Sequence, residues 1–146
     1  MLVREFQPDD QPNVIRLWHR CGLTRPWNDP ALDIQRKLTG QPEWLLVAVV
    51  DDSIVGAVMV GYEGHRGWIN YLAVDPEHQR LGIGQELMRS AESRLLAVRC
   101  PKINLQIRTD NLDAIAFYEA IGFSQDAVVS YGKRLIPDSP SEQYLR

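Results

Sequence analysis

The sequence predicts an α/β fold in which helices flank a mixed central β-sheet. Apolar runs typical of strands alternate along the chain with amphipathic helical patterns, and two of these runs are joined by a short polar turn. Another run ends in a glycine-rich loop that opens into a helix. The predicted order of elements is β-α-α-β-β-β-α-β-α-β, which is typical of an α/β sandwich.

The first third of the chain is expected to contain one strand and two helices. Residues 2–6 predict a strand, and a helix capped by Asp9 or Asp10 follows it. After a loop, Asp29-Pro30 places an N-cap residue before a proline at the first helical position. This pair predicts a short helix that ends near Thr39.

The middle of the chain predicts three strands and a long helix. Residues 44–50 and 54–62 are apolar runs joined by Asp51-Asp52-Ser53, which indicates a β-hairpin. The next strand is expected over residues 68–74. It leads through the glycine-rich loop into a helix over residues 84–98, whose apolar positions share one face.

The last third predicts a strand over residues 102–108, a helix over 111–121 and a closing β segment over 127–136. From Pro137 onward the chain is polar and is expected to fray.

Composition favours one enzyme-sized domain over residues 1–146, because a chain of 146 residues with 45% apolar content can bury one substantial core. The formal net charge of -3 and the pI near 5.6 disfavour a general nucleic-acid or anionic-membrane binder. No apolar run reaches the roughly eighteen residues of a transmembrane helix, and the first residues lack the pattern of a signal peptide. We therefore expect a cytoplasmic location.

The cysteines and histidines predict no metal site. Cys21 and Cys100 have no CxxC or Cys/His spacing and lie in apolar segments, so we expect structural roles for both. His19, His65 and His78 are scattered, and no pair of them stands at ligand spacing with a carboxylate.

The glycine-rich loop is the strongest chemical signal in the sequence. It reads Gln79-Arg80-Leu81-Gly82-Ile83-Gly84. Its glycines let the backbone take unusual dihedrals and approach a ligand closely, while loop N–H groups and the helix N-terminus carry positive partial charge. The loop therefore predicts a phosphate site. It is not a P-loop, because Gln85-Glu86 replaces the required Lys-Ser or Lys-Thr, and it lacks the third glycine of a Rossmann fingerprint.

A second motif lies further along the chain. Residues 111–123 match the pattern N-x-x-A-x-x-F-Y-x-x-x-G-F. With the Q/R-x-x-G-x-G/A pattern of the loop, this segment resembles the two signatures of the GCN5-related N-acetyltransferases, the GNAT family. The resemblance covers nearly the whole chain in element order. The stretches 25–30, 61–67 and 132–136 further resemble a small bacterial subgroup often labelled YpeA-like.

The resemblance implies the GNAT fold and an acetyl-CoA-dependent N-acetyltransferase that transfers acetyl directly from the thioester to an amine. The CoA diphosphate would lie on the glycine loop, where the charge of Arg80 adds to the N–H groups. The pantetheine arm would pair with backbone groups of Leu72, Ala73 and Val74. In the family, this part of the fourth strand carries a bulge, and the fourth and fifth strands splay apart to admit the ligand.

Acetyl transfer needs an acid for the departing thiolate and a base for the attacking amine. Tyr118 matches the tyrosine of the family's F-Y pair and is the expected acid, with a purely structural role in an aromatic core as the alternative. Asn111 matches a position that hydrogen-bonds the pantetheine arm, and helix N-capping is its alternative role.

The base is less defined, because Gln106 occupies the position where related enzymes often carry a glutamate, and Asn70 is also an amide. The nearest available carboxylate is Glu63, acting directly or through water. His65 is the next candidate. A reaction with no dedicated base, in which the amine arrives partly deprotonated, is a third possibility.

The acceptor amine would bind near the loop between the first two helices. Arg25 and Arg66 are candidates to read an acidic group on the acceptor, and Trp27 to stack on it. A small metabolite, a free amino acid, a protein N-terminus and a lysine side chain all remain open as acceptors. The alternative function is a CoA-binding regulatory or interaction module with little transfer activity. A homodimer is possible, with residues 127–136 as its contact.

Overall fold

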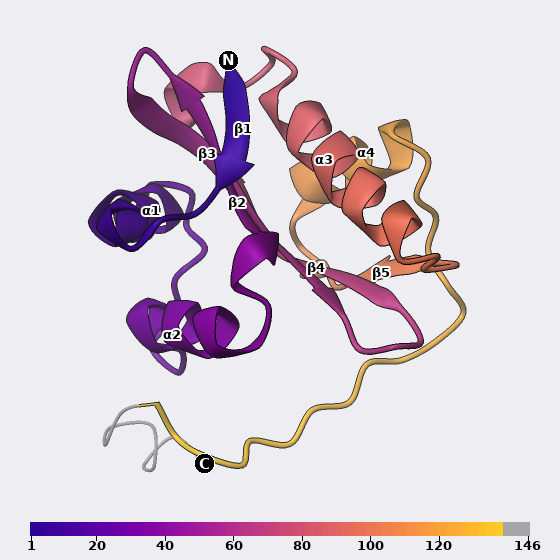
Figure 1. The fold of residues 1–146 in the computed structure, drawn as a ribbon. Coiled ribbons are helices and arrows are strands. Elements are labelled where there is room, and N and C mark those ends of the chain that lie inside the picture. The colour runs from indigo at the N-terminus through magenta and orange to yellow at the C-terminus, as the bar shows by residue number, and fades with distance from the viewer. Residues whose placement is uncertain (139–146) are drawn as a thin grey trace.

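The computed structural model describes residues 1–138 and is built around a five-stranded mixed sheet (Figure 1). The strands lie across the sheet in chain order. They are β1 (Leu2–Glu5), β2 (Leu45–Val50), β3 (Ser53–Tyr62), β4 (Gly67–Val74) and β5 (Ile103–Leu105). Neighbours from β1 to β4 pair antiparallel, whereas β5 pairs parallel with β4. The predicted α/β fold class with a mixed sheet is confirmed.

The helices α1 (Gln11–Arg20) and α2 (Pro30–Gly40) cover one face of this sheet (Figure 1). The core on this face consists of Phe6, Val14, Leu17, Trp18, Ile34, Leu45, Val47, Ala57 and Ala73. Asp29 caps α2 as predicted, because its side chain accepts hydrogen bonds from the backbone N–H groups of Ala31 and Leu32.

The predicted cap of the first helix is wrong in its detail. A short 3-10 turn, Pro8–Asp10, precedes α1, and the Asp10 side chain does not cap the helix. Its carboxylate turns back instead, accepting hydrogen bonds from both terminal nitrogens of Arg4 and from the backbone N–H of Gln7. Asp10 thus joins the first strand to the entry of α1.

The helices α3 (Ile83–Ala97) and α4 (Leu112–Ala120) cover the opposite face. The buried side of α3 is apolar and lies against the inner strands through Ile83, Leu87, Met88, Ala91 and Leu95. From α4, Tyr118 joins the same core. Because α3 connects β4 to the parallel strand β5, it begins at the C-terminal end of β4.

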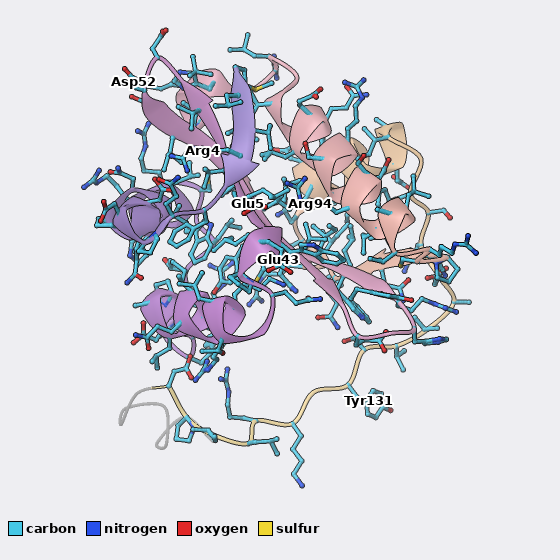
Figure 2. The ribbon with its side chains drawn as sticks, in the orientation of Figure 1. Arg4, Glu5, Glu43, Asp52, Arg94 and Tyr131 are labelled. Atoms are coloured by element: carbon cyan, nitrogen blue, oxygen red, sulfur yellow. The ribbon has the colours of Figure 1, made fainter. Side chains whose placement is uncertain are left out.

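The predicted strand over residues 127–136 is wrong. The chain forms no strand there and runs as an extended segment below the sheet towards α2, carrying Tyr131 in Figure 2. Large apolar side chains of this segment are exposed, namely Val128, Val129, Tyr131, Leu135 and Ile136. Its β-branched and aromatic residues favour a strand, but a strand also requires a partner ladder. The strand predicted over residues 102–108 is likewise shorter, ending at Leu105.

The end of the described chain is anchored rather than frayed. The Asp138 side chain is 1% exposed and accepts hydrogen bonds from the backbone N–H of Asp29 and from Arg36. The rest of the segment predicted to fray lies outside the described residues. None of the helices within residues 1–138 is long and apolar enough to cross a membrane.

Candidate functional site

A cleft opens where β4 and β5 stop pairing. The two strands pair only from Gly67 to Ile69 on β4 and from Ile103 to Leu105 on β5, and the chain beyond Leu105 leaves the sheet. The cleft has a volume of about 350 Å³. Its lining comes from β4, the segment after β5, α4 and the loop between α1 and α2. The expected splay between the fourth and fifth strands is confirmed.

A bulge in β4 shapes one wall of the cleft. In the pairing with β3, Tyr71 and Leu72 together face a single residue, Val58. Tyr71 has a φ of 54°, a left-handed conformation that is rare for a bulky residue. Such a bulge turns backbone groups away from the ladder and makes them available to a ligand. The bulge that the resemblance implied in the fourth strand is confirmed.

The side chain of Tyr71 fixes this strained position. Its ring stacks on Trp18 of α1, with the centroids 3.9 Å apart and the planes at 12°. Its hydroxyl donates a 2.6 Å hydrogen bond to Asp33 of α2. Burial, followed by the hydrogen bond to Asp33, raises the pKa of Tyr71, so the hydroxyl stays protonated as the donor. Side chains of α1 and α2 therefore hold the bulge in place. Sequence patterning alone did not predict these two contacts.

The glycine-rich loop follows the C-terminal end of β4. Arg80 and Gly82 both have left-handed backbone conformations, with φ values of 65° and 80°. Gly82 is the N-cap of α3, and no side chain caps this helix. Because the first N–H groups of a helix have no intrahelical acceptor, they remain available to an anion. Gln79, Arg80 and Leu81 are exposed along the loop.

Gly84 has a different role from Gly82. It lies within α3 and shows no left-handed φ, so the expectation of unusual dihedrals is wrong at this position. A Cβ atom there would lie 3.2 Å from Cζ of Phe117 and 3.5 Å from Cγ2 of Val74. Gly84 therefore lets α3 pack closely against α4, whereas a Cβ at Gly82 would meet no atom within 4 Å.

Asp75 supports the start of the loop. Its carboxylate accepts a 2.9 Å hydrogen bond from Arg20 of α1 and another from the backbone N–H of Glu77. One residue earlier, the carbonyl of Val74 accepts a bond from the thiol of Cys21 at 3.2 Å. The end of α1 is thereby tied to the point where β4 meets the loop. Both cysteines are free, and the thiol of Cys100 donates to the carbonyl of Lys102.

Tyr118 projects from α4 into the lining of the cleft. The residue is 9% exposed, and its ring contacts Phe117 and Phe123 edge-to-face. Burial raises the pKa of Tyr118 to about 12, so the hydroxyl is protonated at neutral pH. This hydroxyl forms no hydrogen bond with any other group of residues 1–138, which leaves it available to a ligand.

Asn111 also lines the cleft, at the start of α4. Its side-chain oxygen accepts a 3.2 Å hydrogen bond from the backbone N–H of Ala114, so the capping role is confirmed. The contact to pantetheine stays a prediction. Leu72 lines the cleft as well, while Ala73 and Val74 continue the strand beyond it.

The candidate bases lie apart from this centre. Glu63 is exposed in the turn between β3 and β4, where it accepts a hydrogen bond from the backbone N–H of Arg66. Neither Glu63 nor His65 contributes to the cleft lining, whereas Asn70 and Gln106 do. Within residues 1–138, no group of His, Cys, Asp and Glu side chains is arranged to hold a metal ion.

The loop between α1 and α2 closes the remaining side of the cleft. Arg25 and Asn28 of this loop line it, together with Arg108 from the segment after β5. The guanidinium carbon of Arg108 lies 5.6 Å from the ring centroid of Trp27. Sequence reasoning missed Arg108, because only the tertiary fold brings this segment against the loop.

Comparisons with known proteins agree with this geometry. A sequence model described as "Acetyltransferase (GNAT) family" matches residues 11–123. The chain is 49% identical over 139 residues to "Acetyltransferase SG1711" of Sodalis glossinidius, covering 94% of this chain and 98% of that relative. The structure is similar to Ard1 from Thermoplasma volcanium, with a TM-score of 0.75, 32% identity and coverage of 86% of this chain and 84% of that one.

The fold is also similar to that of an aminoglycoside N-acetyltransferase, AAC(6')-Iy, in complex with CoA. The TM-score is 0.71 at 15% identity, and the match covers 92% of this chain and 100% of that chain. The family match contains both motifs, the bulged strand and the cleft. The chain therefore belongs to the GNAT family of acetyltransferases.

Proposed function

We propose that this chain transfers the acetyl group of acetyl-CoA directly to an amine within a complex of both substrates. The observation that carries this proposal is the free hydroxyl of Tyr118 in a cleft beside the β4 bulge. The diphosphate would lie on residues 79–84 at the uncapped N-terminus of α3, and backbone groups of residues 72–74 with Asn111 would hold the pantetheine arm. A protein of similar fold, AAC(6')-Iy, is found in complex with CoA, which supports CoA as the ligand of this fold.

Tyr118 would act on the sulfur as the thioester breaks. The Tyr118 pKa of about 12 exceeds that of a thiol, whose usual pKa is about 8.5. Tyr118 would therefore first stabilise the developing thiolate as a hydrogen-bond donor. Complete proton transfer requires that the bound substrates lower its pKa. Binding of CoA needs no such hydroxyl, so Tyr118 is the residue that separates transfer from binding.

Glu63 remains the proposed base, acting through water from the β3–β4 turn. Glu63 is exposed and does not line the cleft, which supports a second route in which the amine arrives deprotonated. The variant Glu63→Gln distinguishes catalysis by this base from the route without a dedicated base. A strong loss of turnover with unchanged acetyl-CoA affinity supports a base, whereas unchanged turnover supports the route without one.

The first test is the thermal stability of the purified chain with acetyl-CoA, using NADH, ATP and inorganic phosphate as controls. Acetyl-CoA at about 100 times its Kd should stabilise the fold by about 2.7 kcal/mol, which raises the Tm by roughly 5–10 °C. Release of free thiol that depends on an added amine then reports transfer. The absence of any shift at saturating acetyl-CoA would refute the proposed function.

The alternative is a CoA-binding regulatory or interaction module. The observation that favours it is the lack of a carboxylate or histidine in the described lining of the cleft. Such a module would show the thermal shift with acetyl-CoA but no amine-dependent thiol release, and Tyr118→Phe would change neither.

A cytoplasmic location and a homodimer complete the proposal. The support for a dimer is the exposed apolar side chains of residues 127–136, which would be covered by a second copy of the chain. Sedimentation equilibrium tests it, since a monomer at all concentrations would exclude this contact.

A further inference from the structure

The acceptor side of the cleft carries positive charge that acetyl-CoA does not explain. Arg25 and Arg108 both line the cleft, while residues 79–84, where the diphosphate is proposed to bind, do not. The pantetheine arm and the acetyl group are uncharged. The two guanidinium groups therefore have no partner among the proposed CoA contacts.

Neither guanidinium group is neutralised within residues 1–138. Arg25 donates to the carbonyl oxygens of Gly22 and Thr24, and Arg108 lies over the ring of Trp27. Neither forms an ion pair with a carboxylate of the described chain. The described lining of the cleft contains no Asp or Glu, and its other polar side chains include the amides Asn28, Asn70 and Gln106.

The loop geometry holds both cations at the cleft. The carbonyl contacts of Arg25 tie its side chain to the turn that follows α1, and the amide N–H of Leu23 in this turn donates to the carbonyl of Trp18. Trp27 positions Arg108 from the same loop by a cation–π contact. A planar guanidinium fork matches a carboxylate with two parallel hydrogen bonds, so this arrangement suits an anionic group.

We propose that the acceptor is a small amine that carries a carboxylate near its reactive nitrogen, and that Arg25 and Arg108 bind this carboxylate. This inference rests on the proposed acetyl transfer. The cleft, at about 350 Å³, must also admit the end of the pantetheine arm, which favours a small acceptor. An acceptor with several positive charges would meet two like charges and no compensating carboxylate of the described lining.

The same arginines would also favour deprotonation of the acceptor amine, for which the described lining provides no base. A nearby positive charge disfavours the protonated form of an amine and lowers its pKa. The ammonium group of the acceptor would therefore lose its proton to solvent more readily at this site. One pair of residues thus orients the acceptor and increases its reactive, neutral fraction.

The test compares matched acceptors in the thiol-release assay with acetyl-CoA. The panel contains free amino acids, their carboxamides, the corresponding decarboxylated amines, phosphoethanolamine and the polyamine spermidine. We expect the amino acids to have kcat/KM values at least tenfold above those of their carboxamides and decarboxylated amines. Preference for phosphoethanolamine over every amino acid would show that the site selects a phosphate, and would overturn the assignment to a carboxylate.

Variants connect this preference to the two arginines. Arg108→Gln and Arg25→Gln should each raise the KM for the amino acid at least tenfold, leave the KM for acetyl-CoA unchanged and reduce the preference over the carboxamide. Arg108→Lys should restore part of the preference, because it keeps the charge. Arg16→Gln is the matched control, since Arg16 is exposed on α1 and bonds only Asn13 among residues 1–138.

The outcomes separate the two proposals. Efficient acetylation of carboxamides, decarboxylated amines or spermidine would overturn this inference and leave the acetyltransferase intact. Acetyl-CoA binding with no carboxylate-bearing amine acetylated would also overturn it. A lack of acetyl-CoA binding would instead refute the proposed function itself.

Discussion

Among the individual residues, Tyr118 combines burial with an unused hydroxyl. Its ring is held by two aromatic neighbours, so the direction of the hydroxyl is set before any ligand binds. Such preorganisation is what distinguishes a positioned donor from a tyrosine that only fills a core. The two roles make different predictions for removal of the oxygen atom.

Tyr118→Phe should lower kcat by about 10²-fold or more, because it removes the donor to the departing thiolate while keeping the ring. The Kd for acetyl-CoA, measured by calorimetry, should stay within about twofold, since binding is assigned to other groups. Tyr131→Phe is the control, because Tyr131 is 92% exposed and does not line the cleft. Wild-type turnover in Tyr118→Phe would assign Tyr118 to packing alone.

Substitution of Gly84 tests whether this position of the glycine-rich loop binds the ligand or lets two helices pack closely. Gly84→Ala should destabilise the fold by about 1–3 kcal/mol, because the new methyl group presses on the ring of Phe117. The free energy of unfolding in urea measures this cost. Adding Phe117→Leu should recover part of it by making room. A Gly84→Ala variant with full stability but weak acetyl-CoA binding would reverse the assignment to packing.

Among the elements, β4 is the one whose irregularity shapes a wall of the cleft. The ring of Tyr71 stacks on Trp18 of α1, and its hydroxyl donates a hydrogen bond to Asp33 of α2. These two contacts hold the strained backbone of the bulge at Tyr71 and Leu72 in place. The two contacts come from the helices on one face, whereas Tyr118, the proposed acid, comes from a helix on the other.

Tyr71→Phe keeps the stack on Trp18 and removes the hydrogen bond to Asp33. We expect a loss of about 1–3 kcal/mol in the free energy of unfolding, because the acceptor is a carboxylate. Acetyl-CoA affinity should fall by about 3- to 10-fold as the bulge loosens. Tyr62→Phe is the control, since its hydroxyl bonds only the Gly64 carbonyl in the β3–β4 turn. Unchanged affinity would mean that the stack alone fixes the bulge.

The elements also show what sequence patterning could and could not predict. Apolar runs predicted β1 to β4, and helical apolar spacing together with cap residues predicted α1 to α4. Consecutive residues of β2 and β3 are buried on both faces of the sheet, and a continuous apolar run records this burial. The segment 127–136 has strand-like composition, yet strand formation depends on a partner that patterning does not specify. The β4 bulge was expected only through the family resemblance, since its causes, Trp18 and Asp33, are distant in sequence.

The candidate site divides in the same way. The glycine loop and Tyr118 lie in contiguous motifs, so their positions could be predicted from spacing. Arg108 and Trp27 come into contact only through the tertiary fold, and no local sequence pattern predicts that contact. The sequence indicates Glu63 as the nearest available carboxylate, but the fold places it in a turn outside the cleft lining.

At the scale of the whole molecule, two carboxylates tie separate elements of the fold together. Asp10 joins β1 to the entry of α1, and Asp138 joins the end of the described chain to α2. The hydrogen bonds from Arg4 lower the pKa of Asp10, and those from Arg36 lower the pKa of Asp138. Both groups stabilise the fold only while they are ionised.

This pairing predicts the acid sensitivity of the fold. Because the folded pKa of Asp10 lies below its unfolded value of 3.8, its contribution is fully present above that pH and is lost as the pH falls through the folded pKa. Asp10→Asn should lower the Tm at pH 7, and the difference from wild type should shrink as the pH falls below 3.8. Asp9→Asn, at an exposed position, is the control. A difference that persists at low pH would point to packing instead of charge.

The contact between Trp27 and Arg108 also gives the molecule an intrinsic optical reporter. Trp27 is 37% exposed and touches a side chain that lines the cleft, while Trp18 is fully buried against Tyr71. A carboxylate that draws Arg108 away would alter the surroundings of the Trp27 indole. It would leave unchanged the other three tryptophans, Trp18, Trp44 and Trp68, which do not line the cleft. Acceptor binding should therefore be readable from tryptophan emission in unlabelled protein, before any catalytic turnover is measured.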